Sequence, residues 1–291
     1  MGKTFEALSR TDKEKGNESL FPPEFSESPE NRPPVEARRD DWRPDVLPPA
    51  GEPAGTDFSP EPIRDFPQLR MPRALRKLSK SKETALALEE YRKMKNKIFS
   101  FESDKPIKTI LFCSSHRGEG NSTVCLNFAQ TLAVQGYRVF LVDANLRNPT
   151  LHSPFQLGQV NGLTDLCLGN TRMEDTMKKT MLDNLWVMTS GVPYSNPSAI
   201  FGSEAFDALL DQIKSQADCI LFDSPPLDSY DDSIALAAKV DGVVLVIESE
   251  KTRREVAHKS KQRLENTGAR ILGVVLNKRK LYIPNWLYKR L

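Results

Sequence analysis

The chain has 291 residues and a formal net charge of only +2, a length that allows one large α/β domain or a smaller domain with a tail. No apolar run approaches the roughly 18 residues that span a bilayer, and the amino terminus lacks the apolar stretch of a secretory signal, so we expect a cytoplasmic protein. The four cysteines stand singly in apolar runs, which favours core packing over a disulfide framework or a metal site.

Proline marks the first part of the chain. Thirteen of the 21 prolines lie between Pro22 and Pro72, in a stretch that is rich in charges and poor in apolar residues. Such a segment cannot bury enough apolar surface to offset the entropy lost on ordering. We therefore predict a disordered, Pro-rich region over residues 1–71 and a folded domain over residues 72–291, which ends in a basic segment at residues 278–291.

Apolar patterns predict the elements of this domain in chain order. Residues 84–99 have apolar side chains at helical steps, and residues 107–114 form an uninterrupted apolar run typical of a buried strand. A glycine-containing loop, a helix over residues 122–135 and a buried strand over residues 138–143 follow. Further strands are predicted over 185–188, 219–223, 242–247 and 271–276, and further helices over 203–215, 231–238 and 252–267. This alternation indicates an α/β fold with a mostly parallel sheet and helices on both faces.

The loop between the first strand and the next helix reads SSHRGEGNST and has the setting of a P-loop. In that motif glycines let backbone N–H groups surround phosphate at a helix N-terminus, a hydroxyl binds Mg²⁺, and a lysine bridges the outer phosphates. Asn121 stands at the lysine position and brings no positive charge. The predicted nucleotide-binding residues of this loop are Gly118, Glu119, Gly120, Asn121, Ser122 and Thr123.

Two aspartates stand at the ends of predicted strands. Asp143 ends the strand in VDANLR, and Asp223 ends the strand in FDSPP. Ligands bind at the carboxyl ends of strands in open α/β sheets, so one carboxylate could hold Mg²⁺ through water while the other acts as a base. A single aspartate in this position is more often a helix N-cap, but two of them after a P-loop-like turn favour a nucleotide site.

From about Ala85 to Leu291 the chain resembles the bacterial tyrosine kinases, cytoplasmic P-loop proteins of the partition-ATPase-like class that regulate capsule and exopolysaccharide export. Members of that family commonly have GEGKST, LVDADLRRP and ILIDTPP, and this chain has GEGNST, LVDANLRNP and ILFDSPP. The segments GLTDLCLGN, GVPYSNPSAIFGSEAF, DGVVLVIESEKTR and GVVLNKR are also similar to family landmarks.

The resemblance implies ATP and Mg²⁺ as cofactors. It implies that Ser122 and Asp223 hold the metal, that Asp143 and Arg147 are catalytic, and that Asn277 contacts adenine.

The resemblance also implies partners. Glu89, Arg92 and Lys95 match an E-x-x-R-x-x-R oligomerisation pattern, which predicts a homo-oligomer, although lysine at the last position lacks the arginine fork. The other implied partner is a membrane chain-length-determinant protein, or polysaccharide co-polymerase, which would recruit the chain to the cell membrane. No specific nucleic acid is expected.

Three departures from the family pattern bear on catalysis. Asn121 lacks the lysine charge, Asn145 replaces the second carboxylate of the D-x-D pair, and the tyrosine-rich tail is reduced to Tyr282 and Tyr288, the possible phosphoacceptors. Phosphoryl transfer depends on positioning and charge stabilisation, so we predict a regulatory component with impaired catalysis.

Two other functions remain open at this point. In the first, the chain is an active ATP-dependent tyrosine autokinase in which Arg117, or Arg92 of a neighbouring subunit, supplies the missing charge. In the second, it is a partition or positioning ATPase, although such proteins carry an early lysine in a KGGxGK loop that is SSHRGEGN here.

Overall fold

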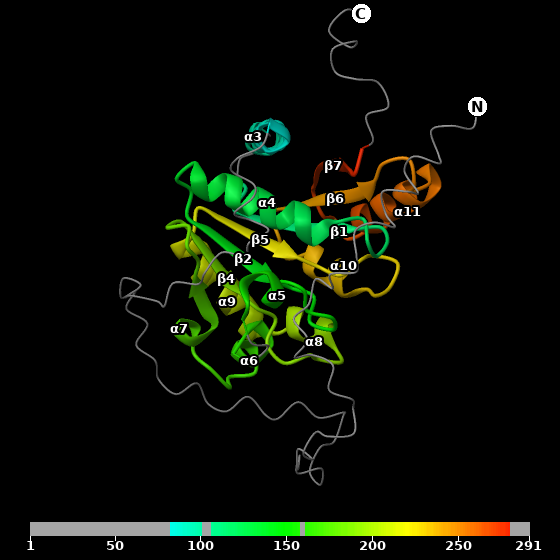
Figure 1. The fold of residues 1–291 in the computed structure, drawn as a ribbon. Coiled ribbons are helices and arrows are strands. Elements are labelled where there is room, and N and C mark those ends of the chain that lie inside the picture. Colours follow the sequence, from blue (N-terminus) through cyan, green and yellow to red (C-terminus); the bar gives the residue numbers. More distant parts are fainter. Residues whose placement is uncertain (1–81, 101–105, 158–160, 280–291) are drawn as a thin grey trace, which may run out of the picture. The chain divides into compact units, whose positions relative to one another are not determined.

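A seven-stranded sheet forms the centre of the computed structural model, which describes residues 82–100, 106–157 and 161–279 (Figure 1). The strands are β1 (Thr109–Ser114), β2 (Val139–Asp143), β3 (Met177–Lys179), β4 (Leu185–Met188), β5 (Cys219–Asp223), β6 (Gly242–Glu248) and β7 (Ile271–Asn277). Their order is β3-β4-β2-β5-β1-β6-β7, and every neighbouring pair is parallel except β3 with β4. The sheet is therefore mostly parallel, as the sequence predicts.

The helices are α3 (Lys82–Phe99), α4 (Asn121–Val134), α5 (His152–Phe155), α6 (Leu163–Cys167), α7 (Met173–Thr176), α8 (Pro197–Phe201), α9 (Glu204–Gln216), α10 (Asp232–Ala237) and α11 (Arg254–Glu265). The sequence patterns anticipated the longer ones, α3, α4, α9 and α11, together with α10. They missed β3 and the helices α5 to α8, none of which exceeds five residues.

Alternate residues of the strands pack against different helices. In β1, Ile110 and Phe112 belong to a buried cluster with α4 and the end of α3, whereas Leu111 and Cys113 belong to a second cluster with α8, α9 and α10. Figure 1 shows α3 and α4 on one side of the sheet and α8 and α9 on the other. Since both sides of each central strand are covered, the strands read as continuous apolar runs.

The connections at the carboxyl ends of β1 and β5 diverge. Strand β1 leads into α4 on one face, and its neighbour β5 leads into α10 on the opposite face. Such a divergence leaves a crevice outside the strand ends, which is where ligands bind in open α/β sheets. The loops after β1, β2 and β5 therefore meet at one edge.

Several expectations fall outside the described residues. They are the Pro-rich region 1–71, the tyrosines Tyr282 and Tyr288, and the basic segment 278–291 except for Lys278 and Arg279. Within the described part of the chain, no helix is both long and apolar enough to cross a membrane.

Candidate functional site

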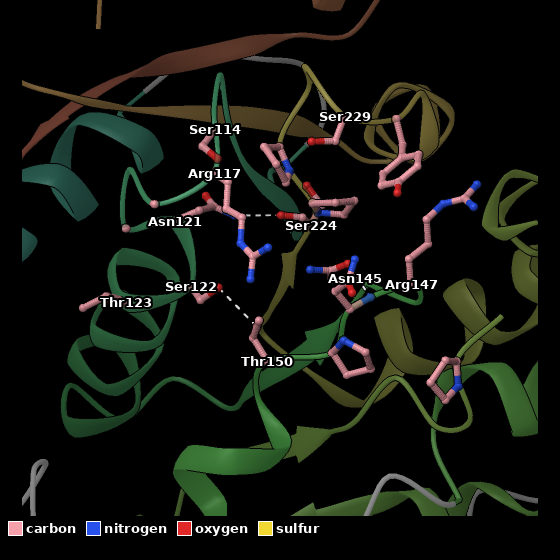
Figure 2. A pocket seen from close by; sticks show the side chains of 18 of the residues that line it. Ser114, Arg117, Asn121, Ser122, Thr123, Asn145, Arg147, Thr150, Ser224 and Ser229 are labelled. Carbon is pink, nitrogen blue, oxygen red and sulfur yellow. Dashed lines mark hydrogen bonds between the residues drawn. The ribbon is translucent and has the colours of Figure 1, made fainter. Parts of the chain in front are cut away.

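A cavity of about 930 Å³ opens at the carboxyl edge of the sheet, between the glycine loop and the loops that follow β2 and β5 (Figure 2). Its charged lining side chains are Arg117, Arg147 and Lys278, and among the described residues that line it there is no carboxylate. A pocket whose wall carries only positive charges suits an anionic ligand.

The glycine loop owes its shape to two residues in the left-handed region. Gly118 has φ +87° and Gly120 has φ +90°, which side chains rarely adopt. A Cβ on Gly120 would lie 2.2 Å from Nδ2 of Asn277, which donates a hydrogen bond to the Glu119 carbonyl at 2.8 Å. Position 120 therefore requires glycine, because its φ is positive and because a Cβ would collide with Asn277. Asn277, the predicted adenine contact, is bonded to the glycine loop.

Glu119 is buried and anchors the loop from behind. Its carboxylate accepts a hydrogen bond from the backbone N–H of His116 at 2.8 Å and another from the hydroxyl of Thr252. Helix α4 begins directly after the loop, so its free N–H groups face the cavity edge, which is the usual arrangement at a phosphate site. The side chain of Glu119 contributes no negative charge to the cavity wall.

Asn121 is buried and its amide faces the end of the sheet. The amide nitrogen Nδ2 lies 2.9 Å from the Phe112 carbonyl, 2.8 Å from Oδ1 of Asp223 and 3.1 Å from the Ser224 carbonyl. All three neighbours are acceptors, so the amide must present its nitrogen to them. The side chain at the lysine position therefore has no donor left over for a phosphate.

Asp143 and Asp223 lie opposite each other in the register of β2 and β5, as their strand-end positions predict. Burial and then the nearby charge of Asp143 raise the pKa of Asp223 to about 7. Burial also raises the pKa of Asp143 to about 6, against the lowering effect of backbone hydrogen bonds from Leu151, Thr150 and Asn145. Two carboxyl groups that titrate near neutrality therefore lie beneath the cavity.

The two carboxylates have different partners. Asp143 accepts from three backbone N–H groups, at 2.8 Å from Thr150 and Leu151 and 3.1 Å from Asn145, and so fixes the loop after β2. Asp223 instead accepts from the hydroxyl of Thr150 at 3.1 Å, in addition to the Asn121 amide. Thr150 also lines the cavity, so Asp223 contacts a residue of the cavity wall.

Ser122 completes a short chain of oxygen atoms. Its hydroxyl lies 3.2 Å from that of Thr150, which in turn donates to Asp223, whereas Thr123 is exposed on the first turn of α4 (Figure 2). Hydroxyl and carboxylate oxygens are ligands that Mg²⁺ accepts, and Mg²⁺ usually takes one or two carboxylates plus phosphate. The described part of the chain holds no group of three or more acidic, His or Cys side chains that could bind a metal ion. The oxygen atoms of Ser122, Thr150 and Asp223 fit a metal that is shared with a phosphate ligand.

Thr150 was missed by the sequence reasoning. It follows LRNP, and only the fold brings its hydroxyl between Ser122 and Asp223.

The side chain of Arg147 extends away from Ser122 and Thr150 (Figure 2). Its Nε donates to Oδ2 of Asp232 at 2.6 Å and its Nη2 to Oδ1 at 3.2 Å, while Nη1 donates to the Ser195 carbonyl at 2.6 Å. The guanidinium also lies 4.3 Å from the centre of the Tyr230 ring. These contacts clamp the loop after β2 to α10, and the catalytic role stays a prediction.

Asn145, which replaces the second carboxylate of the D-x-D pair, lies in the cavity wall. Its side-chain oxygen accepts from the backbone N–H of Asn148 at 3.1 Å, which holds the turn. A neutral amide here cannot serve as a base.

Helix α3 carries the predicted oligomerisation residues. Glu89 and Arg92 are exposed, and Glu89 pairs with Lys93 at 3.7 Å instead of with Arg92. Lys95 is half-buried, with its ammonium 5.5 Å from the centre of the Tyr137 ring. The helix therefore presents Arg92 to solvent while Lys95 turns toward the body of the domain.

Comparison with known proteins identifies relatives of the chain. The family profile described as "ParA: NUBPL iron-transfer P-loop NTPase" matches residues 106–287. The tyrosine-protein kinase YwqD of Bacillus subtilis is 36% identical over 197 residues, which are 68% of this chain and 83% of that protein. The tyrosine-protein kinase CpsD of Streptococcus agalactiae is 33% identical over 177 residues, which are 60% of this chain and 77% of that protein.

A solved structure agrees with these relatives. The crystal structure of the chimerical protein CapA2B2 is similar with a TM-score of 0.66 and 31% identity, over 74% of this chain and 96% of that one. The fold is thus that of a ParA-type P-loop NTPase, as the sequence predicts.

Proposed function

Because the chain belongs to the bacterial tyrosine kinase family, we propose that it is a cytoplasmic regulatory component of capsule or exopolysaccharide polymerisation and export whose own phosphoryl transfer is impaired. The observation that carries this proposal is the state of Asn121, which is neutral and whose amide nitrogen is already occupied by three acceptors. The chain keeps the cradle for a nucleotide but lacks the cation that the P-loop normally supplies.

The expected loss is large. Phosphoryl transfer is accelerated almost entirely by positioning and by charge that stabilises the transition state. Removing one preorganised donor from such a site commonly lowers the rate on the order of 100-fold or more. Asn145 also replaces a carboxylate. The cavity therefore has neutral amides both at the lysine position, Asn121, and at the position of a possible base, Asn145.

ATP with Mg²⁺ is the ligand we assign to the cavity, since P-loop proteins of this family use nucleotide and Mg²⁺ in general. The metal would be held by Ser122 and Asp223 with support from Thr150, and it would neutralise phosphate charge when bound. The N–H groups at the start of α4 would bind the phosphates, and Asn277 would remain beside the loop.

The chain would act through partners. We assign it a membrane chain-length-determinant protein that recruits it to the inner face of the membrane, and self-association through the α3 face that exposes Glu89 and Arg92. Both assignments rest on the family resemblance.

Phosphotyrosine on the purified full-length chain tests the proposal. The chain is incubated with ATP and Mg²⁺, and phosphotyrosine is measured by immunoblot and mass spectrometry in the wild type and in Asn121→Lys. We expect little phosphotyrosine in the wild type and a gain of at least about tenfold in Asn121→Lys, because the lysine restores charge at the phosphates. Abundant phosphotyrosine in the wild type would refute impairment.

The alternative function, an active autokinase that modifies Tyr282 or Tyr288, is favoured by one observation. Arg117 lines the same cavity and could supply positive charge. That alternative predicts abundant wild-type phosphotyrosine and no gain from Asn121→Lys.

A further inference from the structure

The cavity has three cationic side chains in its described lining, and they differ in what they already contact. Arg147 is bound by the carboxylate of Asp232. Lys278 donates from Nζ to the Gly118 carbonyl at 2.5 Å and lies 3.2 Å from a carboxylate oxygen of Glu248. The charges of both side chains are therefore partly neutralised by carboxylates.

Arg117 has no such partner. It is exposed, and within the described residues no hydrogen bond or ion pair engages its guanidinium. Figure 2 shows the guanidinium directed into the cavity, in the space between Asn121 on one side and Ser122 and Thr150 on the other. The unpaired guanidinium of Arg117 thus places a positive charge beside Asn121, whose own side chain is neutral.

The surroundings explain why Arg117 stays free. The loop's own carboxylate, Glu119, lies behind the loop and is held by His116 and Thr252, and the described residues that line the cavity include no acidic side chain. The buried Asp223 is occupied by Asn121 and Thr150. An unpaired guanidinium in a wall without carboxylates is predisposed to bind an external anion, and its planar fork matches two phosphate oxygens.

We propose that Arg117 is the cation that holds the nucleotide polyphosphate in this chain, in place of a lysine at position 121. The inference rests on the proposed function, since it takes the cavity to be a nucleotide site. It assigns Arg117 to ligand binding and leaves phosphoryl transfer impaired. The reason is that the side-chain amide of Asn121 still donates to Phe112, Asp223 and Ser224 instead of to a phosphate.

Nucleotide titration of the full chain tests this assignment. Calorimetry in Mg²⁺ compares ATP, ADP and adenosine across the wild type, Arg117→Gln, Arg117→Lys and Arg254→Gln. Arg254 is an exposed arginine of α11 that does not line the cavity, so its variant makes the same change in net charge. Thermal unfolding of Arg117→Gln should match that of the wild type, since the side chain is exposed and unbonded.

We expect Arg117→Gln to weaken ATP and ADP binding roughly 10- to 100-fold, which is the usual effect of losing a charge-assisted hydrogen bond. Arg117→Lys should weaken binding less, because it keeps the charge but not the fork. Arg254→Gln should bind ATP and ADP like the wild type, and adenosine should bind Arg117→Gln and the wild type equally.

A second arm uses Asn121→Lys. If both cations serve the same phosphates, this substitution should improve ADP binding more in the Arg117→Gln background than in the wild type. The assignment is overturned if Arg117→Gln binds ADP as tightly as the wild type, or if the wild type binds neither nucleotide. The first result leaves the proposed function standing, whereas the second also removes the nucleotide from it. Impairment itself is decided by phosphotyrosine.

Discussion

Removing the guanidinium of Arg147 should lower the free energy of unfolding, because this group pairs with a buried carboxylate. The side chain of Asp232 is only 2% exposed, and its carboxylate accepts two hydrogen bonds from Arg147 and one from the Ser198 hydroxyl at 3.2 Å. In Arg147→Ala the carboxylate keeps only the Ser198 contact. Leaving a buried charge without its partner costs about 3–5 kcal/mol.

The measurement is urea or thermal unfolding of Arg147→Ala, Asp232→Asn and the double variant. A loss of 3–5 kcal/mol in a domain of this size corresponds to a fall in Tm of roughly 10 °C. Asp232→Asn removes the charge as well as the pairing, so it should cost less than Arg147→Ala. The double variant should be more stable than the sum of the single effects predicts, by about 1.5–3 kcal/mol.

The reasoning fails if Arg147→Ala unfolds like the wild type. A second contrary result is strict additivity, because it would mean that the two side chains do not act as a pair. Activity can be compared in the Asn121→Lys background, where phosphoryl transfer is expected to be measurable. If Arg147→Ala kept full stability but abolished the activity of that background, the catalytic role implied by the family resemblance would be supported instead of the structural contact with Asp232.

Two further predictions follow from the cavity floor and the glycine loop. Without nucleotide and Mg²⁺, stability should fall as pH rises from 5 to 8, because folded Asp143 and Asp223, with pKa values of about 6 and 7, still hold protons that the unfolded carboxyls have released. Asp223→Asn should flatten this slope in urea unfolding measured at each pH, and a slope of opposite sign would contradict the raised pKa values. Gly120→Ala should lower Tm and ADP affinity more than Gly118→Ala, since both positions strain the backbone but only at Gly120 would a Cβ meet Asn277. Equal effects of the two substitutions would show that this close approach does not matter.

Much of the fold was accessible from sequence because the central strands are covered on both sides. Runs such as ILFC in β1 and FLV in β2 must be apolar at every position. These runs could therefore be recognised as buried strands from the local sequence, without knowledge of which strands they pair with. The missed elements are too short to establish a period, and β3 pairs antiparallel at the edge of the sheet.

The sequence predicted where the residues of the candidate site lie along the backbone, but not which way their side chains point. Register alone brings Asp143 opposite Asp223, and the glycine loop follows from its position between β1 and α4. The direction of Arg147 depends on Asp232, which lies 85 residues further along the chain, and no local pattern encodes that contact. The role of Thr150 likewise depends on two other segments meeting its hydroxyl.

The amide at position 121 changes more than one interaction of the site. A lysine beside Asp223 would favour the ionised carboxylate through its charge, whereas the Asn121 amide offers only a hydrogen bond, and burial leaves the pKa of Asp223 at about 7. A carboxyl group that is partly protonated at neutral pH is a weaker partner for Mg²⁺. Under the proposed function, asparagine at position 121 would therefore reduce the charge at the phosphates and also weaken the metal side of the site. Because phosphoryl transfer needs both, we expect Arg117 to provide affinity for the nucleotide without restoring the rate.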